Sequence, residues 1–241
     1  MWLYTVLTTA PRLAWPLIRL GIAGRENVPS RGPVIVATNH SSFIDPWLVA
    51  CLFPLQPVHF LVTARWYERS RFWRWFFDGQ YCIPAALEDP VETIGRSVEL
   101  LRQGATLGIF PEGRISRDGR VQRGRVGIGW AAALTGIPVV PAALRGSFEV
   151  LPRDHRWPRP GRIELRIGPP RVFPAPATVV PDPGAVRDFV GDVMEDLCRL
   201  AGQPERTDAV RPRVAVDLGP SLAAWLESRR AGADGMGHVS Q

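Results

Sequence analysis

His40 and Asp45 stand five positions apart in the stretch ATNHSSFIDPW, between an apolar run and a proline. On one continuous helix, two residues with this spacing would point about 140° away from each other. A turn over residues 41–44 would instead fold the carboxylate back onto the imidazole. A carboxylate bonded to one ring nitrogen fixes the tautomer and leaves the other nitrogen as a base. The pair is therefore a candidate for deprotonating a hydroxyl group. The alternative is that Asp45 only caps a helix and that His40 is unrelated to it.

Glu112 is a second candidate, because it also follows an apolar run, in the stretch GIFPEG at residues 108–113. In open α/β sheets, ligands bind in the crevice beyond the carboxyl ends of the strands. If both apolar runs are strands of such a sheet, His40 and Glu112 are expected to meet at one edge. Glu112 on its Pro–Glu–Gly turn is then placed to bind a polar substrate. The alternative is an ordinary surface turn.

The elements that must position these residues alternate between strands and helices. Apolar, β-branched runs bounded by Gly and Pro predict strands at residues 32–38, 58–64, 81–87, 105–110 and 137–146, with a half-exposed edge strand at 162–170. Helices are predicted at residues 46–53, where Asp45 is the expected N-cap, and at 66–78, 90–104, 124–136 and 184–202. This alternation predicts an α/β fold with a largely parallel central sheet flanked by helices.

The two ends of the chain differ from this central part. Residues 1–22 are apolar but are interrupted by Arg12 and Arg19, so no charge-free run reaches the roughly 20 residues of a spanning helix. We predict an N-terminal membrane-interfacial helix over residues 1–23, the alternative being a helix packed on the protein's own core. The main domain is expected at 24–202. Residues 203–241 are a Pro-, Arg- and Gly-rich extension, in which we expect a short helix at 221–230 and a disordered tail at 231–241.

Composition limits the possible partners and cofactors. The net charge is +6, the pI is about 10.2, and all 29 basic residues are arginine. Such a surface attracts phosphate groups of lipids, nucleotides or nucleic acids. The three cysteines give no disulfide framework and indicate a reducing cytosolic environment, and the four scattered histidines suggest no metal site. The absence of lysine excludes a Walker A loop.

Three segments together resemble the glycerolipid acyltransferases. NHSSFIDP is similar to their NHxxxxD motif, FPEG to their second signature, and GIPVVPAALRGSFEVLPR to their last motif. The resemblance covers about residues 24–152 and is strongest to the 1-acyl-glycerol-3-phosphate acyltransferases. It implies transfer of a fatty acyl group from acyl-CoA or acyl carrier protein to the hydroxyl of a lyso-glycerolipid, giving phosphatidic acid.

The resemblance also implies roles for individual residues. His40 would be the general base and Asp45 its orienting partner, while Glu112, Gly113 and Arg114 would hold the glycerol-phosphate head. No cofactor, metal or covalent acyl-enzyme is implied. The expected partners are the acyl donor, the lyso-lipid acceptor and the membrane surface, with no nucleic acid. The expected location is the cytoplasmic face of the cell membrane, as a peripheral or monotopic protein.

Two departures from the family pattern concern the acceptor phosphate. Ala85 stands where the family carries an arginine, and Ile115 stands where a second one is usual, so that this arginine is shifted to Arg114. A phosphate site depends on well-placed charged donors, and Arg65, Arg123 and Arg125 are possible substitutes. The departures leave two alternatives open: an acyltransferase for a phosphate-free lyso-lipid, and a catalytically inactive lipid-binding protein.

The stretch RSRFWRWFF at residues 69–77 interleaves arginines with aromatic residues. On a helix, one face carries Trp66, Phe72, Trp73, Phe76 and Phe77, and the opposite face carries Arg71, Arg74 and Asp78. This amphipathic pattern favours contact with a membrane surface or an acyl groove over single-stranded nucleic acid. Ordinary core packing is the alternative.

Overall fold

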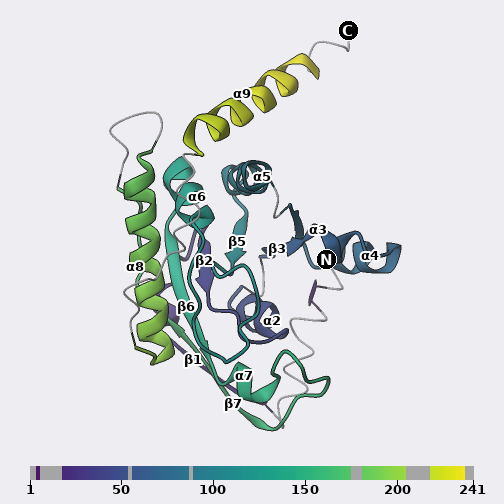
Figure 1. Ribbon diagram of the computed structural model, residues 1–241, viewed down its shortest axis with the longest axis vertical. Helices are drawn as coiled ribbons and strands as arrows, with labels where there is room; N and C mark the ends of the chain where they lie inside the picture. Colours follow the sequence, from purple (N-terminus) through teal and green to yellow (C-terminus); the bar gives the residue numbers. More distant parts are fainter. Residues whose placement is uncertain are drawn as a thin grey trace.

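The computed structural model describes residues 4–5, 18–53, 56–86, 89–174, 181–204 and 218–236. Its centre is one sheet with the strand order β1-β7-β6-β2-β5-β3-β4 (Figure 1). All neighbouring strands are parallel except β6 and β7. The predicted α/β fold with a largely parallel sheet is therefore confirmed. The strands are β1 (Ile18–Ala23), β2 (Ile35–Thr38), β3 (Val58–Thr63), β4 (Ile83–Ala85), β5 (Thr106–Ile109), β6 (Val139–Arg145) and β7 (Gly161–Ile167).

Helices cover both faces of the sheet, and each face has its own apolar core. Side chains in and just before β2 alternate between the two: Ile35 and Ala37 pack with α5, α6 and α8, while Val36 and the preceding Val34 pack with α2. The helices are η1 (Arg25–Asn27), α2 (Asp45–Ala50), α3 (Ala64–Tyr67), α4 (Arg71–Gly79), α5 (Pro90–Arg102), α6 (Gly127–Thr135), α7 (Ser147–Val150), α8 (Pro183–Ala201) and α9 (Gly219–Met236).

The C-terminal helix α9 packs on α5, as Figure 1 shows. Leu222 and Leu226 are buried in the same core as α5, and the Trp225 ring lies directly over Gly95 of that helix. The short helix predicted at 221–230 is therefore present, but it is longer than expected. Residues 231–236 belong to α9, so the prediction of a disordered tail is wrong for them; residues 237–241 lie outside the described part.

The end of the predicted interfacial helix is a strand instead. Ile18–Ala23 forms β1 and pairs in parallel with β7. Apolar side chains recur at every second position, as in a strand, at Ile18, Leu20 and Ile22. The backbone of β1 pairs with the edge of β7 that would otherwise be open. Of the preceding residues, Tyr4 is buried in the protein's core, where its hydroxyl accepts a hydrogen bond of 3.2 Å from the Val58 amide. Tyr4 and Thr5 are helical, and residues 1–3 and 6–17 of the predicted helix lie outside the described residues.

Two further predictions need correction. The strand predicted at 162–170 is β7, which lies between β6 and β1 and not at the edge of the sheet. The single helix predicted at 66–78 is divided into α3 and α4, because Ser70 adopts extended backbone and its hydroxyl accepts from the Trp73 amide as an N-cap. In the described part of the chain, no helix combines the length and apolarity needed to cross a bilayer.

Candidate functional site

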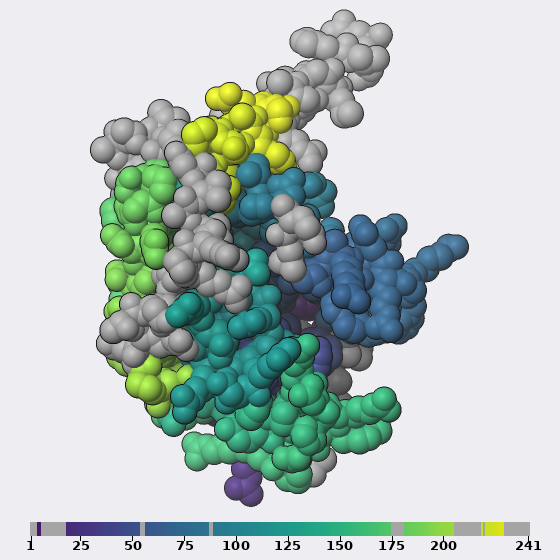
Figure 2. Space-filling view, in the orientation of Figure 1, coloured from purple at the N-terminus to yellow at the C-terminus, as the bar shows by residue number. Residues whose placement is uncertain are grey.

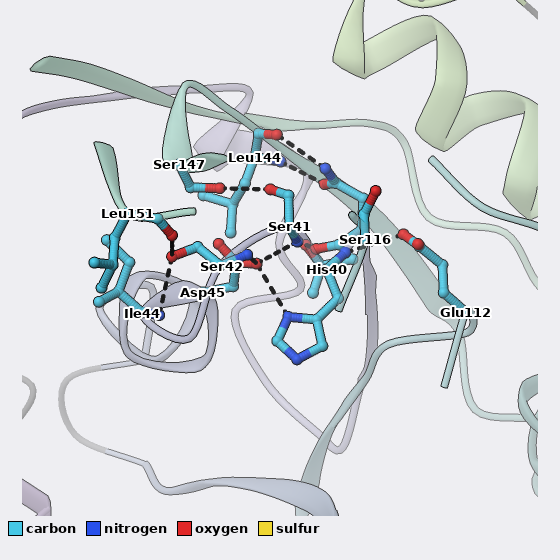
Figure 3. Close-up of polar contacts among 12 residues, drawn as sticks. His40, Ser41, Ser42, Ile44, Asp45, Glu112, Ser116, Leu144, Ser147 and Leu151 are labelled. Atoms are coloured by element: carbon cyan, nitrogen blue, oxygen red, sulfur yellow. Dashed lines mark hydrogen bonds and ion pairs between the residues drawn. The ribbon is translucent and has the colours of Figure 1, made fainter. Parts of the chain in front are cut away.

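The turn after β2 brings His40 and Asp45 together, as the sequence predicted. His40 Nδ1 lies 3.0 Å from Asp45 Oδ2 (Figure 3). The same carboxylate oxygen accepts hydrogen bonds of 2.7 Å from the backbone amides of Ser41 and Ser42. Asp45 is not the N-cap that was predicted: it is the first residue of α2, after Ile44, and its side chain bonds to the preceding turn. The helix therefore presents a fully buried carboxylate to the imidazole.

The imidazole keeps one nitrogen directed away from this carboxylate, as Figure 3 shows. The His40 side chain retains 15% of its accessible surface. One ring face stacks on Phe110, with 3.9 Å between ring centroids, and Phe110 stacks in turn on Phe60 of β3. The stacking and the carboxylate together fix the plane of the ring, and Phe110 lines the site with an apolar wall. The role of Phe110 was not foreseen, although it directly precedes the predicted Pro–Glu–Gly turn.

Three polar side chains attach the His40 turn to neighbouring elements. Asn39 donates to the Leu144 carbonyl at 3.0 Å and accepts from the Leu144 amide at 2.8 Å, which joins the turn to β6. The Ser41 hydroxyl lies 2.8 Å from that of Ser147, and the Ser42 hydroxyl donates to the Leu151 carbonyl. The sequence pattern did not predict this role, although Asn39, Ser41 and Ser42 lie next to His40 in the stretch ATNHSSFIDPW.

Glu112 meets His40 at the edge of the sheet, because β5 lies directly beside β2. Its Oε1 accepts a hydrogen bond of 3.0 Å from the backbone amide of His40, and the Ser116 amide donates to the His40 carbonyl at 2.7 Å. Glu112 has no accessible surface. This geometry gives its carboxyl group a role in holding the His40 turn; contact with a substrate stays a prediction.

Burial raises the pKa of Glu112 from 4.5 to about 8. The backbone amides of His40 and Gln122 and the positive charge of Arg114 oppose this rise, but desolvation of the carboxylate outweighs them. The carboxyl group is consequently neutral at and below neutral pH. Under these conditions the carboxyl group of Glu112 bonds to the backbone of His40 without adding a negative charge to that of Asp45.

Gly113 and Arg114 continue the turn that begins at Glu112. Gly113 has a φ of +67°, which favours glycine, and a Cβ there would lie 2.8 Å from Nε of Arg125, so that this side chain would have to shift. Arg114 is exposed. Ala85, by contrast, is buried at the end of β4 and supplies no donor where the family pattern has an arginine. The structure thus gathers His40, Asp45 and Glu112 in direct contact, with Gly113 and Arg114 on the adjoining turn.

This arrangement can perform general-base chemistry. Nδ1 of His40 faces a carboxylate, so the opposite nitrogen is available to accept a proton from a hydroxyl group. The turn is fixed from both sides, by Asp45 and Glu112, and therefore holds the ring with little reorganisation.

Comparisons with known proteins give an independent view of the same chain. A family model described as Acyltransferase matches residues 19–145. The chain is 32% identical over 142 residues to the chloroplastic 1-acyl-sn-glycerol-3-phosphate acyltransferase of Arabidopsis thaliana, covering 57% of this chain and 39% of the relative. It is 28% identical over 155 residues to the 1-acyl-sn-glycerol-3-phosphate acyltransferase of Bacillus subtilis, covering 62% and 72%.

A solved structure shares the fold. The 1-acyl-sn-glycerophosphate acyltransferase of Thermotoga maritima superimposes with a TM-score of 0.65 at 23% identity, covering 83% of this chain and 78% of that one. The match to the plant relatives is more limited, because the chain spans about 40% of their length.

Proposed function

Because this chain belongs to the Acyltransferase family, we propose that it is an O-acyltransferase that esterifies 1-acyl-glycerol-3-phosphate to phosphatidic acid. The observation that carries the proposal is the contact of 3.0 Å between His40 Nδ1 and the buried Asp45 carboxylate. Relatives named for this reaction support the choice of acceptor. A lipid-binding protein without catalytic activity would have no use for an oriented base.

In the proposed mechanism, the acceptor hydroxyl gives its proton to Nε2 of His40 while its oxygen attacks the thioester carbonyl of the acyl donor. Asp45 stabilises the imidazolium that forms. The tetrahedral intermediate then collapses: the carbon–sulfur bond breaks, the new ester remains, and the imidazolium returns the proton to the leaving thiolate. All bonds and protons balance without a covalent acyl-enzyme.

The donor is proposed to be acyl-CoA or acyl carrier protein, both of which present the acyl group as a thioester. Since the acceptor carries a long acyl chain, we place the enzyme peripherally at the cytoplasmic face of the cell membrane, where such a lipid resides. Deletion of residues 1–22 is not a clean test of this location, because it would also remove most of β1 from the sheet and Tyr4 from the core.

A second acceptor class is favoured by one observation. Ala85 is buried and offers no charged donor, so the phosphate of the acceptor would depend on Arg114 and its neighbours. A phosphate-free lyso-lipid would not need a replacement for the missing arginine. The two acceptors share the same base and the same donor chemistry.

The test is an acyl-transfer assay of the purified full chain against a panel of lyso-lipids, with acyl-CoA and acyl carrier protein as donors. Wild-type protein should acylate lysophosphatidate, and His40→Ala should lower the rate by about 10²–10⁴-fold because the general base is lost. Circular dichroism should show that the variant is folded. Preference for a phosphate-free lyso-lipid would move the assignment to the second acceptor, and unchanged turnover by His40→Ala would refute the mechanism.

A further inference from the structure

Helices α3 and α4 together form a projecting unit, residues 64–79, called here the α3–α4 lobe. In Figure 2 it stands out from the body of the protein. No residue of either helix is buried. Large aromatic side chains on its surface are instead open to solvent: Phe72 is 60% exposed, Trp75 is 53% exposed and Trp66 is 43% exposed. Exposed aromatic residues gathered on one element mark a contact surface.

The aromatic side chains of the lobe pack on one another. Trp73 lies 6.0 Å from Trp66, 5.8 Å from Phe76 and 5.6 Å from Phe77, measured between ring centroids. Phe72 packs on this group from outside. The lobe is therefore a preformed apolar platform, and its outermost rings are free to enter another apolar phase without unfolding anything.

The charged side chains of the lobe indicate which apolar partner it contacts. Four arginines are exposed on it, at positions 65, 69, 71 and 74, against two acidic residues, Glu68 and Asp78. The Arg69 guanidinium lies 4.9 Å from the centre of the Trp66 ring, so positive charge and aromatic surface are interleaved. Tryptophan and phenylalanine bordered by arginine suit the interface of an anionic bilayer, where rings enter the acyl boundary and guanidinium groups meet phosphates.

The lobe stands at the edge of the sheet that carries His40. It begins immediately after β3, and β3 is two strands from β2 in the parallel order β2-β5-β3. At the usual strand spacing this is a lateral distance of about 10 Å. His40 is also connected to β3 through the stacked rings of Phe110 and Phe60. A bilayer in contact with the lobe would thus lie beside the catalytic edge.

We propose that the α3–α4 lobe docks the protein on an anionic lipid bilayer and thereby presents His40 to an acceptor that resides in the membrane. The inference rests on the proposed function for its purpose, but the docking itself is a property of the surface. It assigns membrane contact to residues 64–79, which lie in the described part of the chain.

Vesicle binding tests the docking without reference to activity. The full chain is mixed with vesicles of phosphatidylcholine and phosphatidylglycerol and separated by flotation. Phe72→Ser with Trp75→Ser should lower binding about tenfold or more, since both rings would enter the interface. Trp157→Ser is the matched control, because Trp157 is 82% exposed but lies outside the lobe. Wild-type binding by the double variant, or an equal loss in the control, would overturn the proposal.

Activity tests the link to catalysis. With acceptor embedded in vesicles, the double variant should lose rate about as much as it loses binding, while a short-chain acceptor below its micelle concentration should be acylated at the wild-type rate. Loss of rate with the dispersed acceptor as well would assign the lobe to the fold or the active site and overturn the proposal. The proposal would also be overturned if the double variant bound vesicles normally and lost acyl-transfer rate only with acyl carrier protein as the donor. If wild-type protein binds vesicles through the lobe but acylates nothing, the proposed function fails and the docking surface stands.

Discussion

At the scale of single residues, Arg114 is the group on which the choice of acceptor depends. It is exposed, and it directly follows Glu112 and Gly113 on the turn beside His40. If it binds the acceptor phosphate, Arg114→Ala should raise KM for lysophosphatidate about ten- to a hundredfold and leave KM for the acyl donor nearly unchanged. Arg114→Lys should recover only part of the loss, because lysine offers a point charge in place of a fork.

Steady-state kinetics with each substrate varied in turn measures this effect. Arg117→Ala is the control, since Arg117 is also exposed but lies three residues farther along the loop. If the Arg114→Ala enzyme shows wild-type kinetics with lysophosphatidate, the acceptor is not recognised through its phosphate. A phosphate-free lyso-lipid would then be the proposed acceptor.

Glu112 gives a residue-scale prediction about pH and stability. Burial raises the pKa of Glu112 from 4.5 to about 8, so between these values the folded protein keeps a proton that the unfolded chain has lost. The contribution of Glu112 is therefore present at low pH and is lost as pH rises through this window, by roughly 1.4 kcal/mol per pH unit. Glu112→Gln keeps an acceptor oxygen for the His40 amide but cannot titrate.

Urea unfolding of wild type and Glu112→Gln across this pH range isolates the effect, because all other groups titrate in both proteins. The free energy of unfolding of wild type should fall relative to that of the variant as pH rises. A difference that is constant with pH would mean that Glu112 titrates near its ordinary pKa.

At the scale of elements, the packing of α9 on α5 depends on a glycine. A Cβ added at Gly95 would lie 2.4 Å from the Trp225 ring. Gly95→Ala should therefore destabilise the protein by about 1–3 kcal/mol through overpacking, despite the higher helix propensity of alanine. Gly191→Ala in α8 is the matched control: a Cβ there meets nothing within 4 Å, so it should be neutral or stabilising by up to about 1 kcal/mol.

Thermal or urea unfolding compares the two variants directly. Adding Trp225→Ala to Gly95→Ala should abolish the steric conflict, so that Gly95→Ala costs much less in this background than alone. If the Gly95→Ala and Gly191→Ala variants are equally stable, the packing of α9 on α5 contributes little to the free energy of unfolding.

At the scale of the whole molecule, the net charge of +6 predicts a response to salt. Each arginine near an anionic surface contributes roughly 1 kcal/mol, and salt screens this attraction. Binding to vesicles that contain phosphatidylglycerol should therefore weaken about tenfold or more between low and high salt, measured by flotation. Vesicles of phosphatidylcholine alone are the control and should show little dependence on salt. Binding that ignores salt on both vesicles would mean that only the apolar side chains act.

Much of the architecture was predictable because its signals are local. Buried parallel strands are short apolar runs, and the helices between them carry caps and terminal glycines, so β2, β5, β6, α5 and α8 were placed within a few residues. The resemblance to the glycerolipid acyltransferases, carried by the three motifs, is confirmed by the family match. The spacing of His40 and Asp45 after a strand offered their contact as one of two alternatives, the other being a helix cap, and the structure shows the contact.

Other features depend on segments that are far apart in the chain. Local sequence patterns were enough to predict the α/β class, and they offered the contact of Asp45 with His40 as one of two alternatives. Tertiary structure alone decided that Ile18–Ala23 is a strand, because its partner β7 lies more than a hundred residues away and needs an edge to be covered. It also decided that Glu112 is buried against the His40 backbone and that the α3–α4 lobe exposes Phe72 and Trp75 to solvent. The physical reason is that the burial of a residue depends on which distant segments pack against it. The local periodicity of the sequence does not specify those segments.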